Sequence, residues 1–159
     1  MVPIKILKGF TLIELLVVVA IIGILASIVL VSFPTASKKA NDSRIVGAMA
    51  QARKLMIVHY VENGSYATFD TTLTEVKPLA DEILARQGSS GTGLVIVKKT
   101  GNSAACMYAK LSQKGANAYY YCADSTGKAG FFTGTAVQLT AVGANCNTAS
   151  AVCPSSTTG

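Results

Sequence analysis

A glutamate inside an apolar segment is the most conspicuous chemical feature near the start of the chain. Glu14 belongs to the string Lys8-Gly9-Phe10-Thr11-Leu12-Ile13-Glu14-Leu15-Leu16. An acidic side chain within a membrane helix costs on the order of 2.5 to 3.5 kcal/mol by insertion scales and is rare without a partner. Glu14 is therefore expected either to reach the membrane surface or to pair with a positive charge supplied by another subunit.

The order of these residues does not fit a secretory signal peptide. Such a signal has a short apolar core, a small-residue cleavage site after that core, and no acid within it. Here Gly9 precedes the apolar run and Glu14 lies inside the run. The segment is therefore expected to remain as part of the folded protein.

The four cysteines form the second group of reactive side chains, and all lie in the last third of the chain. Gaps of 15, 23 and 6 residues separate Cys106, Cys122, Cys146 and Cys153. No Cys-x-x-Cys pair occurs and the single histidine, His59, is remote, so a zinc site is not expected. An even number of cysteines beyond a membrane-targeting segment favours two disulfides in an oxidising compartment over free thiols.

No pattern of residues predicts catalysis. The acids at positions 70, 75, 81 and 82 lack the spacing of a catalytic carboxylate pair, and the sequence contains no nucleophile elbow, phosphate loop or nucleotide fingerprint. Residues 124–130 have turn chemistry but too few acids for a calcium loop. His59 is expected to pack at the edge of a core. We therefore expect no enzymatic activity, no metal site and no cofactor.

The apolar segment itself has the dimensions of a membrane span. Residues 12–33 contain 22 residues, of which only Glu14, Ser27 and Ser32 are polar. A helix of this length spans about 33 Å, at about 1.5 Å per residue, and a bilayer core is about 30 Å thick. Only 14% of the chain is charged and the net charge is +6. These values argue against a cytosolic protein, and the basic excess is too small for a dedicated nucleic-acid binder.

Helical periodicity continues beyond the apolar segment. One stripe at i, i+3, i+4 and i+7 spacing predicts that the helix extends onto a globular head, with a kink near Pro34 because proline lacks a backbone N–H. Asn63-Gly64 is a typical helix stop. The stripe consists of Ile45, Ala48, Met49, Ala52, Leu55, Met56 and His59.

The rest of the head is expected to contain a second helix at residues 74–87 and strands at 94–98, 104–111 and 118–123. This pattern predicts an α+β fold, with one long N-terminal helix and a small antiparallel sheet. A three-residue hairpin loop at 113–115 would place Cys106 directly opposite Cys122. The remaining pair would be Cys146–Cys153, although two other connectivities stay open.

A tyrosine run on the last expected strand suggests a second kind of function. Tyr119-Tyr120-Tyr121 and Tyr108 could stack on single-stranded nucleic acid. Consecutive strand residues point to opposite faces, however, so at least one tyrosine of the run must face the core. Packing with a solvated basic rim is the favoured interpretation. The rim would contain Lys98, Lys99, Lys110, Lys114 and Lys128.

The string Gly9-Phe10-Thr11-Leu12-Ile13-Glu14 resembles the processing site of type IV prepilins and type II secretion pseudopilins. In that family a membrane aspartyl peptidase cuts after the glycine and methylates the new N-terminal amine. The resemblance implies that Gly9 ends a leader peptide, that Phe10 becomes the methylated N-terminus, and that Glu14 lies near the N-terminus of a neighbouring subunit.

The close resemblance covers residues 8–33, and beyond them it is architectural. Gly23 matches a glycine often found midway along the family's apolar helix. Val31 stands where many pilins have a proline, and the nearest proline is Pro34.

The resemblance also implies an organisation into three parts. Residues 1–9 would be the leader peptide, 10–33 the transmembrane and assembly helix, and 34–159 the pilin head with the second half of the long helix. The expected function is that of a structural subunit of a type IV pilus. Its expected partners are copies of itself in a helical filament, the prepilin peptidase, the inner-membrane assembly machinery and the membrane. The precursor would reside in the inner membrane and the mature protein in the extracellular filament.

Two alternatives remain: a pseudopilin of a type II secretion system, and a membrane-anchored minor pilin that binds DNA or a surface. The major pseudopilin typically carries a calcium site near its C-terminus, so the lack of an acid-rich loop favours a pilus subunit. The sequence does not distinguish a major from a minor subunit, or adhesion from motility or DNA uptake.

Overall fold

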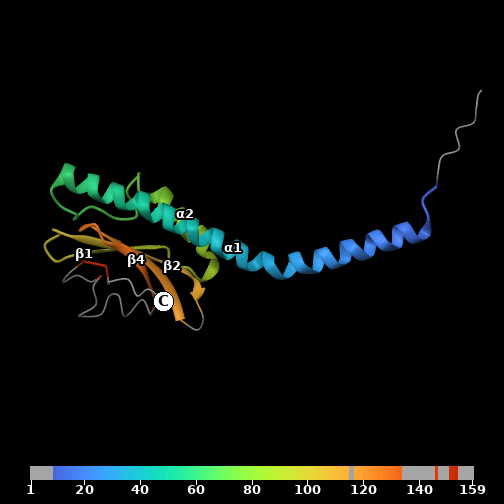
Figure 1. Ribbon diagram of the computed structural model, residues 1–159. Coiled ribbons are helices and arrows are strands. Elements are labelled where there is room, and N and C mark those ends of the chain that lie inside the picture. The colour runs from blue at the N-terminus through green and yellow to red at the C-terminus, as the bar shows by residue number, and fades with distance from the viewer. Residues whose placement is uncertain (1–8, 115–116, 134–145, 147–150, 154–159) are drawn as a thin grey trace, which may run out of the picture. The chain divides into compact units, whose positions relative to one another are not determined.

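The computed structural model describes residues 9–114, 117–133, 146 and 151–153. The chain divides into two compact units, Met1–Ser37 and Lys38–Gly159. Helix α1 (Leu12–Asn63) begins in the first unit and ends in the second, and it is the blue-to-green helix of Figure 1. The predicted continuous helix from the apolar segment to Asn63 is confirmed, with Pro34 inside it.

The first unit presents an apolar surface with no cover of its own. Every side chain from Leu12 to Leu30 is exposed. Of the described residues, α1 alone provides a helix long and apolar enough to cross a membrane, by its length and composition. An apolar surface of this kind is favourable only where lipid or other apolar helices cover it.

The C-terminal end of α1 follows from its local sequence. Gly64 adopts a φ of 66°, in the left-handed region that glycine enters without steric penalty. The backbone N–H of Gly64 donates a hydrogen bond of 2.8 Å to the carbonyl oxygen of Tyr60. Asn63-Gly64 therefore ends the helix as the sequence predicts.

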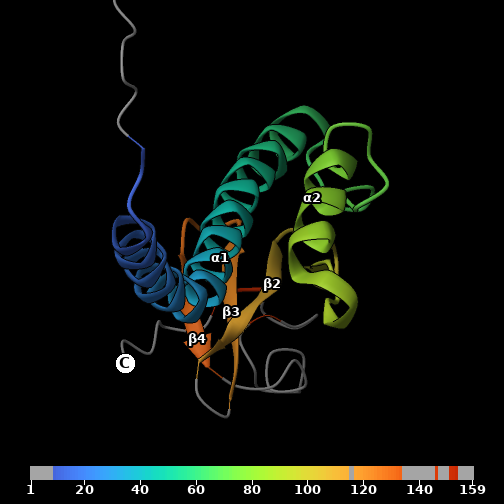
Figure 2. The same ribbon diagram turned by 90° about the vertical axis from the view of Figure 1, so that its right-hand side faces the viewer.

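The second unit is an antiparallel sheet with helices on one face. The strands β1 (Leu94–Lys98), β2 (Ala105–Lys114), β3 (Asn117–Asp124) and β4 (Ala129–Thr133) pair in the order β1-β2-β3-β4. Helix α2 (Lys77–Gln87) precedes the short 3₁₀ helix Gly88–Ser90. In Figure 2 the later half of α1 and α2 lie over the same face of the sheet. The predicted α+β fold is confirmed.

The core between helices and sheet uses the predicted stripe of α1. Ile45, Ala48, Met49, Ala52 and Met56 are all buried. They pack with the apolar residues that alternate along one face of the sheet, because side chains two apart on a strand share a face. From the sheet this core receives Met107, Ala109, Leu111 and Ala123.

A second apolar cluster covers the opposite face of the sheet. It contains all four cysteines together with Tyr108, Tyr120, Phe132 and Ala151. The rings of Tyr120 and Phe132 stack with centroids 5.3 Å apart. Both faces of the sheet are therefore covered by apolar packing in the described part of the chain.

The predicted cysteine pairing is wrong, and the register of the hairpin explains why. Strands β2 and β3 extend to Lys114 and Asn117, with a register shift between Leu111 and Lys114, instead of closing on a loop at 113–115. Cys106 consequently lies opposite Asp124, and Cys122 lies opposite Tyr108. The two cysteines share a face but stand one diagonal step apart, so each bonds to the C-terminal segment.

The disulfides of the structure are Cys106–Cys146 and Cys122–Cys153, each with Cα atoms 5.8 Å apart. They tie the two central strands to two points of the last part of the chain. The predicted Cys106–Cys122 and Cys146–Cys153 bridges are replaced by this long-range pair.

Apart from the longer β2 and β3, helix α2 differs from its predicted extent and strand β4 was not predicted. Helix α2 begins at Lys77 and not at residue 74, because Leu73 to Val76 form a turn in which the Val76 N–H donates to the Leu73 carbonyl at 3.0 Å. Strand β4 is absent from the sequence prediction, which treated residues 124–130 as a turn. The aromatic pair Phe131-Phe132 was the available signal for this strand.

We expect peptide mapping under non-reducing conditions to recover the Cys106–Cys146 and Cys122–Cys153 pairs. The bridged residues are 40 and 31 positions apart, and loop-closure entropy grows slowly with loop length. Replacing either pair with serines should therefore lower the free energy of unfolding by about 3 to 4 kcal/mol, almost equally. Denaturant unfolding of the two double variants measures this. Recovery of a Cys106–Cys122 peptide would contradict the observed register.

Candidate functional site

The first turn of α1 contains a reciprocal pair of hydrogen bonds between Thr11 and Glu14. The Thr11 backbone N–H and hydroxyl donate to Glu14 Oε2 at 2.8 and 2.7 Å. The Glu14 backbone N–H lies 3.3 Å from Thr11 Oγ1 and donates to it. This is a capping box, in which the side chains of Thr and Glu three residues apart satisfy each other's backbone donors.

From the sequence, Glu14 is expected at the membrane surface or paired with a charge of another subunit, and its role as a helix cap is not predicted. The signal was present, because Thr-x-x-Glu before an apolar run is the signature of a capping box. Thr11 and Glu14 both follow the Gly9–Phe10 bond, so cutting that bond leaves every atom of the box in place. A chain cut at that bond would therefore keep the cap.

The capping box leaves half of the Glu14 carboxylate available. Oε2 accepts both hydrogen bonds from Thr11, whereas Oε1 accepts none from the described part of the chain. The ion pairs among the described residues join Arg44 to Glu82 and Lys77 to Asp81, far from this turn in the sequence. Within the described residues, the Glu14 carboxylate, which lies in an apolar stretch of sequence, thus has one oxygen without a partner and open to a cation.

Gly9 and Phe10 precede the helix and are accessible. Neither residue belongs to a regular element, both are exposed, and the Phe10 side chain is 78% exposed. A Cβ built at Gly9 would meet no atom within 4 Å. The peptide bond between the two residues therefore lies in an open segment that another protein could reach.

His59 has the packing role that the sequence predicts. Its half-buried ring tilts against Phe69, with centroids 5.3 Å apart. Its Nε2 lies 3.1 Å from Thr68 Oγ1, within hydrogen-bond distance. Within the described ranges, no group of three His, Cys, Asp or Glu residues is arranged to hold a metal ion.

The tyrosine run is used in packing on both faces of the sheet. Tyr120 is 5% exposed and belongs to the disulfide-bearing cluster. Tyr119 and Tyr121 are half-buried against the helix-side core, and each has its ring near that of Phe131. Tyr108 is also 5% exposed, and burial raises the pKa of its hydroxyl. These rings are not displayed as an open platform for bases.

Asp124 is a buried acid whose role the sequence did not indicate. It lies at the end of β3 and is fully buried. Its Oδ1 accepts hydrogen bonds from the Thr126 N–H and hydroxyl at 2.8 Å and from the Lys128 N–H at 3.0 Å. Its Oδ2 accepts one from the Cys153 N–H at 2.7 Å. Asp124 therefore joins the β3–β4 turn to the C-terminal segment.

Two features characterise the molecule as a whole. One is a capped apolar helix with an acid in its first turn, and the other is the disulfide-bonded α+β head into which this helix continues. The family model of the prokaryotic N-terminal methylation motif matches residues 7–30. The motif, the fold and the relatives described next show that the chain is similar to type IV pilins.

Three relatives illustrate the similarity. The chain is 41% identical over 66 residues to the type IV wide pilus major component PilA4 of Thermus thermophilus, covering 42% of this chain and 50% of that protein. It is 50% identical over 46 residues to fimbrial protein Q of Moraxella bovis, covering 29% of each. It is 33% identical over 75 residues to the type IV major pilin protein PilE1 of Neisseria gonorrhoeae, covering 46% of this chain and 45% of that protein.

The chain thus spans half or less of the length of these relatives. No solved structure matches it significantly.

Proposed function

We infer that this protein is a structural subunit of a type IV pilus, made as a membrane-anchored precursor and built into an extracellular filament. The observation that carries this inference is the match of residues 7–30 to the methylation motif. In the structure, the exposed Gly9–Phe10 bond lies just before the capped, apolar start of α1. The relatives with pilus and fimbrial names support the same function.

In this proposal the three parts of the chain act in sequence. Residues 1–9 are the leader, which the prepilin peptidase removes by cutting after Gly9 before methylating the Phe10 amine. Residues 10–33 hold the precursor in the inner membrane and later form the centre of the filament. Residues 34–159 are the head that the assembly machinery carries to the cell surface.

Assembly rests on the free oxygen of Glu14. After processing, Phe10 carries a positive amine and Glu14 a carboxylate one helical turn away. Pairing within one chain is the simplest alternative; because Thr11 already occupies Oε2, either pairing has to use Oε1. We propose that Glu14 Oε1 accepts a hydrogen bond from the Phe10 amine of the next subunit. Such a contact sets the axial register of two apolar helices. Because it joins the head of one subunit to the tail of the next, the assembly does not close into a ring and grows as a filament.

Processing is tested by the N-terminal sequence and mass of the mature protein. We expect loss of residues 1–9 and an N-methylated Phe10. Gly9→Val should abolish cleavage because the bulkier side chain does not enter the peptidase cleft, whereas Gly9→Ala should retain part of it. No atom of the described chain lies within 4 Å of a Cβ at this position, so the fold does not disfavour either variant. A mature protein that starts elsewhere would refute the proposal.

A pseudopilin would share the same leader and first turn, so the site does not separate it from a pilin. The pilus and fimbrial names of the relatives favour the pilus. Filaments on cells that express the chain at its normal level would support this choice. Filaments only on overexpression, with enzyme secretion lost in a deletion strain, would instead indicate a secretion pseudopilin.

A further inference from the structure

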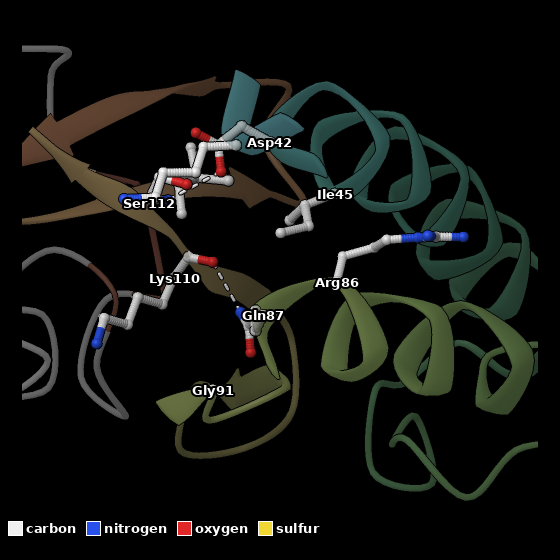
Figure 3. A pocket seen from close by; sticks show the side chains of 9 residues that line it. Asp42, Ile45, Arg86, Gln87, Gly91, Lys110 and Ser112 are labelled. Atoms are coloured by element: carbon white, nitrogen blue, oxygen red, sulfur yellow. Dashed lines mark hydrogen bonds between the residues drawn. The ribbon is translucent and has the colours of Figure 1, made fainter. Parts of the chain in front are cut away.

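A cavity of about 310 Å³ lies in the second unit, where α1, the end of α2 and β2 meet. Figure 3 shows it from close by. Its apolar lining comes from Ile45 and Leu111, both buried. This volume is at the lower end of the range for sites that bind small molecules, about 300 to 1,000 Å³.

The lining of this cavity carries more positive than negative charge. Lys38, Arg86 and Lys110 line it, against one carboxylate, that of Asp42. None of the three cations has an ion-pair partner in the described part of the chain, where the ion pairs involve other residues. In Figure 3 the side chains of Lys110 and Arg86 extend in opposite directions. Both side chains have several rotatable bonds, so binding as proposed below requires each to take a rotamer that turns its charge toward the cavity.

Some polar groups that line the cavity are engaged in hydrogen bonds within the chain, and others have no partner among the described residues. Asp42 Oδ1 accepts a hydrogen bond from the Ser112 backbone N–H at 2.8 Å. Gln87 donates to the Lys110 carbonyl at 2.8 Å and accepts from the Gly93 N–H at 2.7 Å, so its position is set. The second Asp42 oxygen and the Ser112 hydroxyl have no partner among the described residues. They offer an acceptor and a donor to a ligand that carries hydroxyl groups.

We propose that this cavity binds one anionic sugar unit, a uronic acid or a sugar phosphate. The carboxylate or phosphate would face Arg86 and Lys110, since charge-assisted hydrogen bonds are the strong ones. The hydroxyls would bind Asp42 and Ser112, and the C–H face of the ring would cover Ile45 and Leu111. The inference depends on the second unit alone, so its failure would leave the proposed pilus function unchanged.

The test is titration calorimetry on the full chain in a polyoxyethylene detergent, which carries neither sugar nor charge. The probes are glucuronate, glucose 6-phosphate and glucose. We expect saturable binding of at least one anionic probe and binding of glucose at least tenfold weaker, equivalent to about 1.4 kcal/mol. The anion that binds more tightly shows whether the site prefers a carboxylate or a phosphate. Equal binding of glucose, or no saturable binding of either anion, would overturn the proposal.

Variants distinguish specific binding in the cavity from general attraction of an anion to a basic protein. Arg86→Gln with Lys110→Gln should weaken binding of the preferred anion at least tenfold. The matched control, Lys54→Gln with Lys128→Gln, removes the same charge from two exposed residues outside the cavity and should change binding less than twofold. Ser112→Ala leaves the charge and the backbone N–H to Asp42 intact, and should weaken binding severalfold. Equal losses in the two double variants, or no effect of Ser112→Ala, would contradict the assignment.

Discussion

Cells that express only the Glu14→Val variant should accumulate processed subunits in the membrane and form no filaments. Valine removes the desolvation penalty of the acid, so the variant should insert at least as well as the parent and still be cut after Gly9. It also removes the oxygen that we propose binds the Phe10 amine of the next subunit. Comparison of membrane fractions with sheared filaments measures both steps in the same cells.

The capping box complicates this experiment, because valine also removes the helix cap. Glu14→Gln resolves the ambiguity, since glutamine can accept the hydrogen bonds from Thr11 and serve in a capping box. It lacks the charge, and it places an NH₂ donor where the free Oε1 acceptor lies. If charge pairing drives assembly, Glu14→Gln should lose filaments as Glu14→Val does. Filaments of normal length with Glu14→Gln would show that Glu14 acts as a cap, and normal filaments with Glu14→Val would exclude both roles.

The second large effect is expected at Asp124. Asp124→Ala should lower the free energy of unfolding by about 2 to 4 kcal/mol, because a buried donor left without a partner costs about 1 to 3 kcal/mol. The Cys153 N–H is such a donor, since Cys153 is 2% exposed and bonds to Oδ2. Asp124→Asn should recover little of the loss. One amide oxygen cannot serve both the turn and Cys153, and the NH₂ group would face another donor.

Asp70 is a matched control for Asp124. Its Oδ1 accepts hydrogen bonds from the Thr72 N–H and hydroxyl at 2.8 and 2.6 Å, which repeats the local geometry of Asp124 with Thr126. The bonds from Thr72 lower the pKa of the Asp70 carboxyl. The stability that Asp70 contributes is therefore present above the ordinary carboxyl pKa and lost as pH falls through the lowered value.

Denaturant unfolding at neutral pH, followed by the near-ultraviolet circular dichroism of the head, compares the two positions. Asp70→Ala should be far milder than Asp124→Ala, because water can reach the Thr72 donors. Equal losses at both positions would mean that the bond to Cys153 adds nothing to stability.

Features that depend on neighbours in the chain could be predicted from the sequence alone. The apolar run, the continuation of the helix past Pro34 and its end at Asn63-Gly64 follow from periodicity and from the conformational freedom of glycine. The motif around Gly9 and Glu14 is equally local, and so is the capping box, although its signature was overlooked. The burial of Ile45, Met49 and Met56 followed from their spacing on one helix face.

Features that depend on contacts between distant segments were decided only by the tertiary structure. A two-residue change in the register of β2 against β3 kept Cys106 and Cys122 on the predicted face, but it changed the partner of each. The energy difference between such registers comes from packing on both faces of the sheet, which no short sequence window contains. The same holds for Asp124, whose fourth hydrogen bond comes from Cys153, 29 residues away. Only the closed fold brings that donor to it.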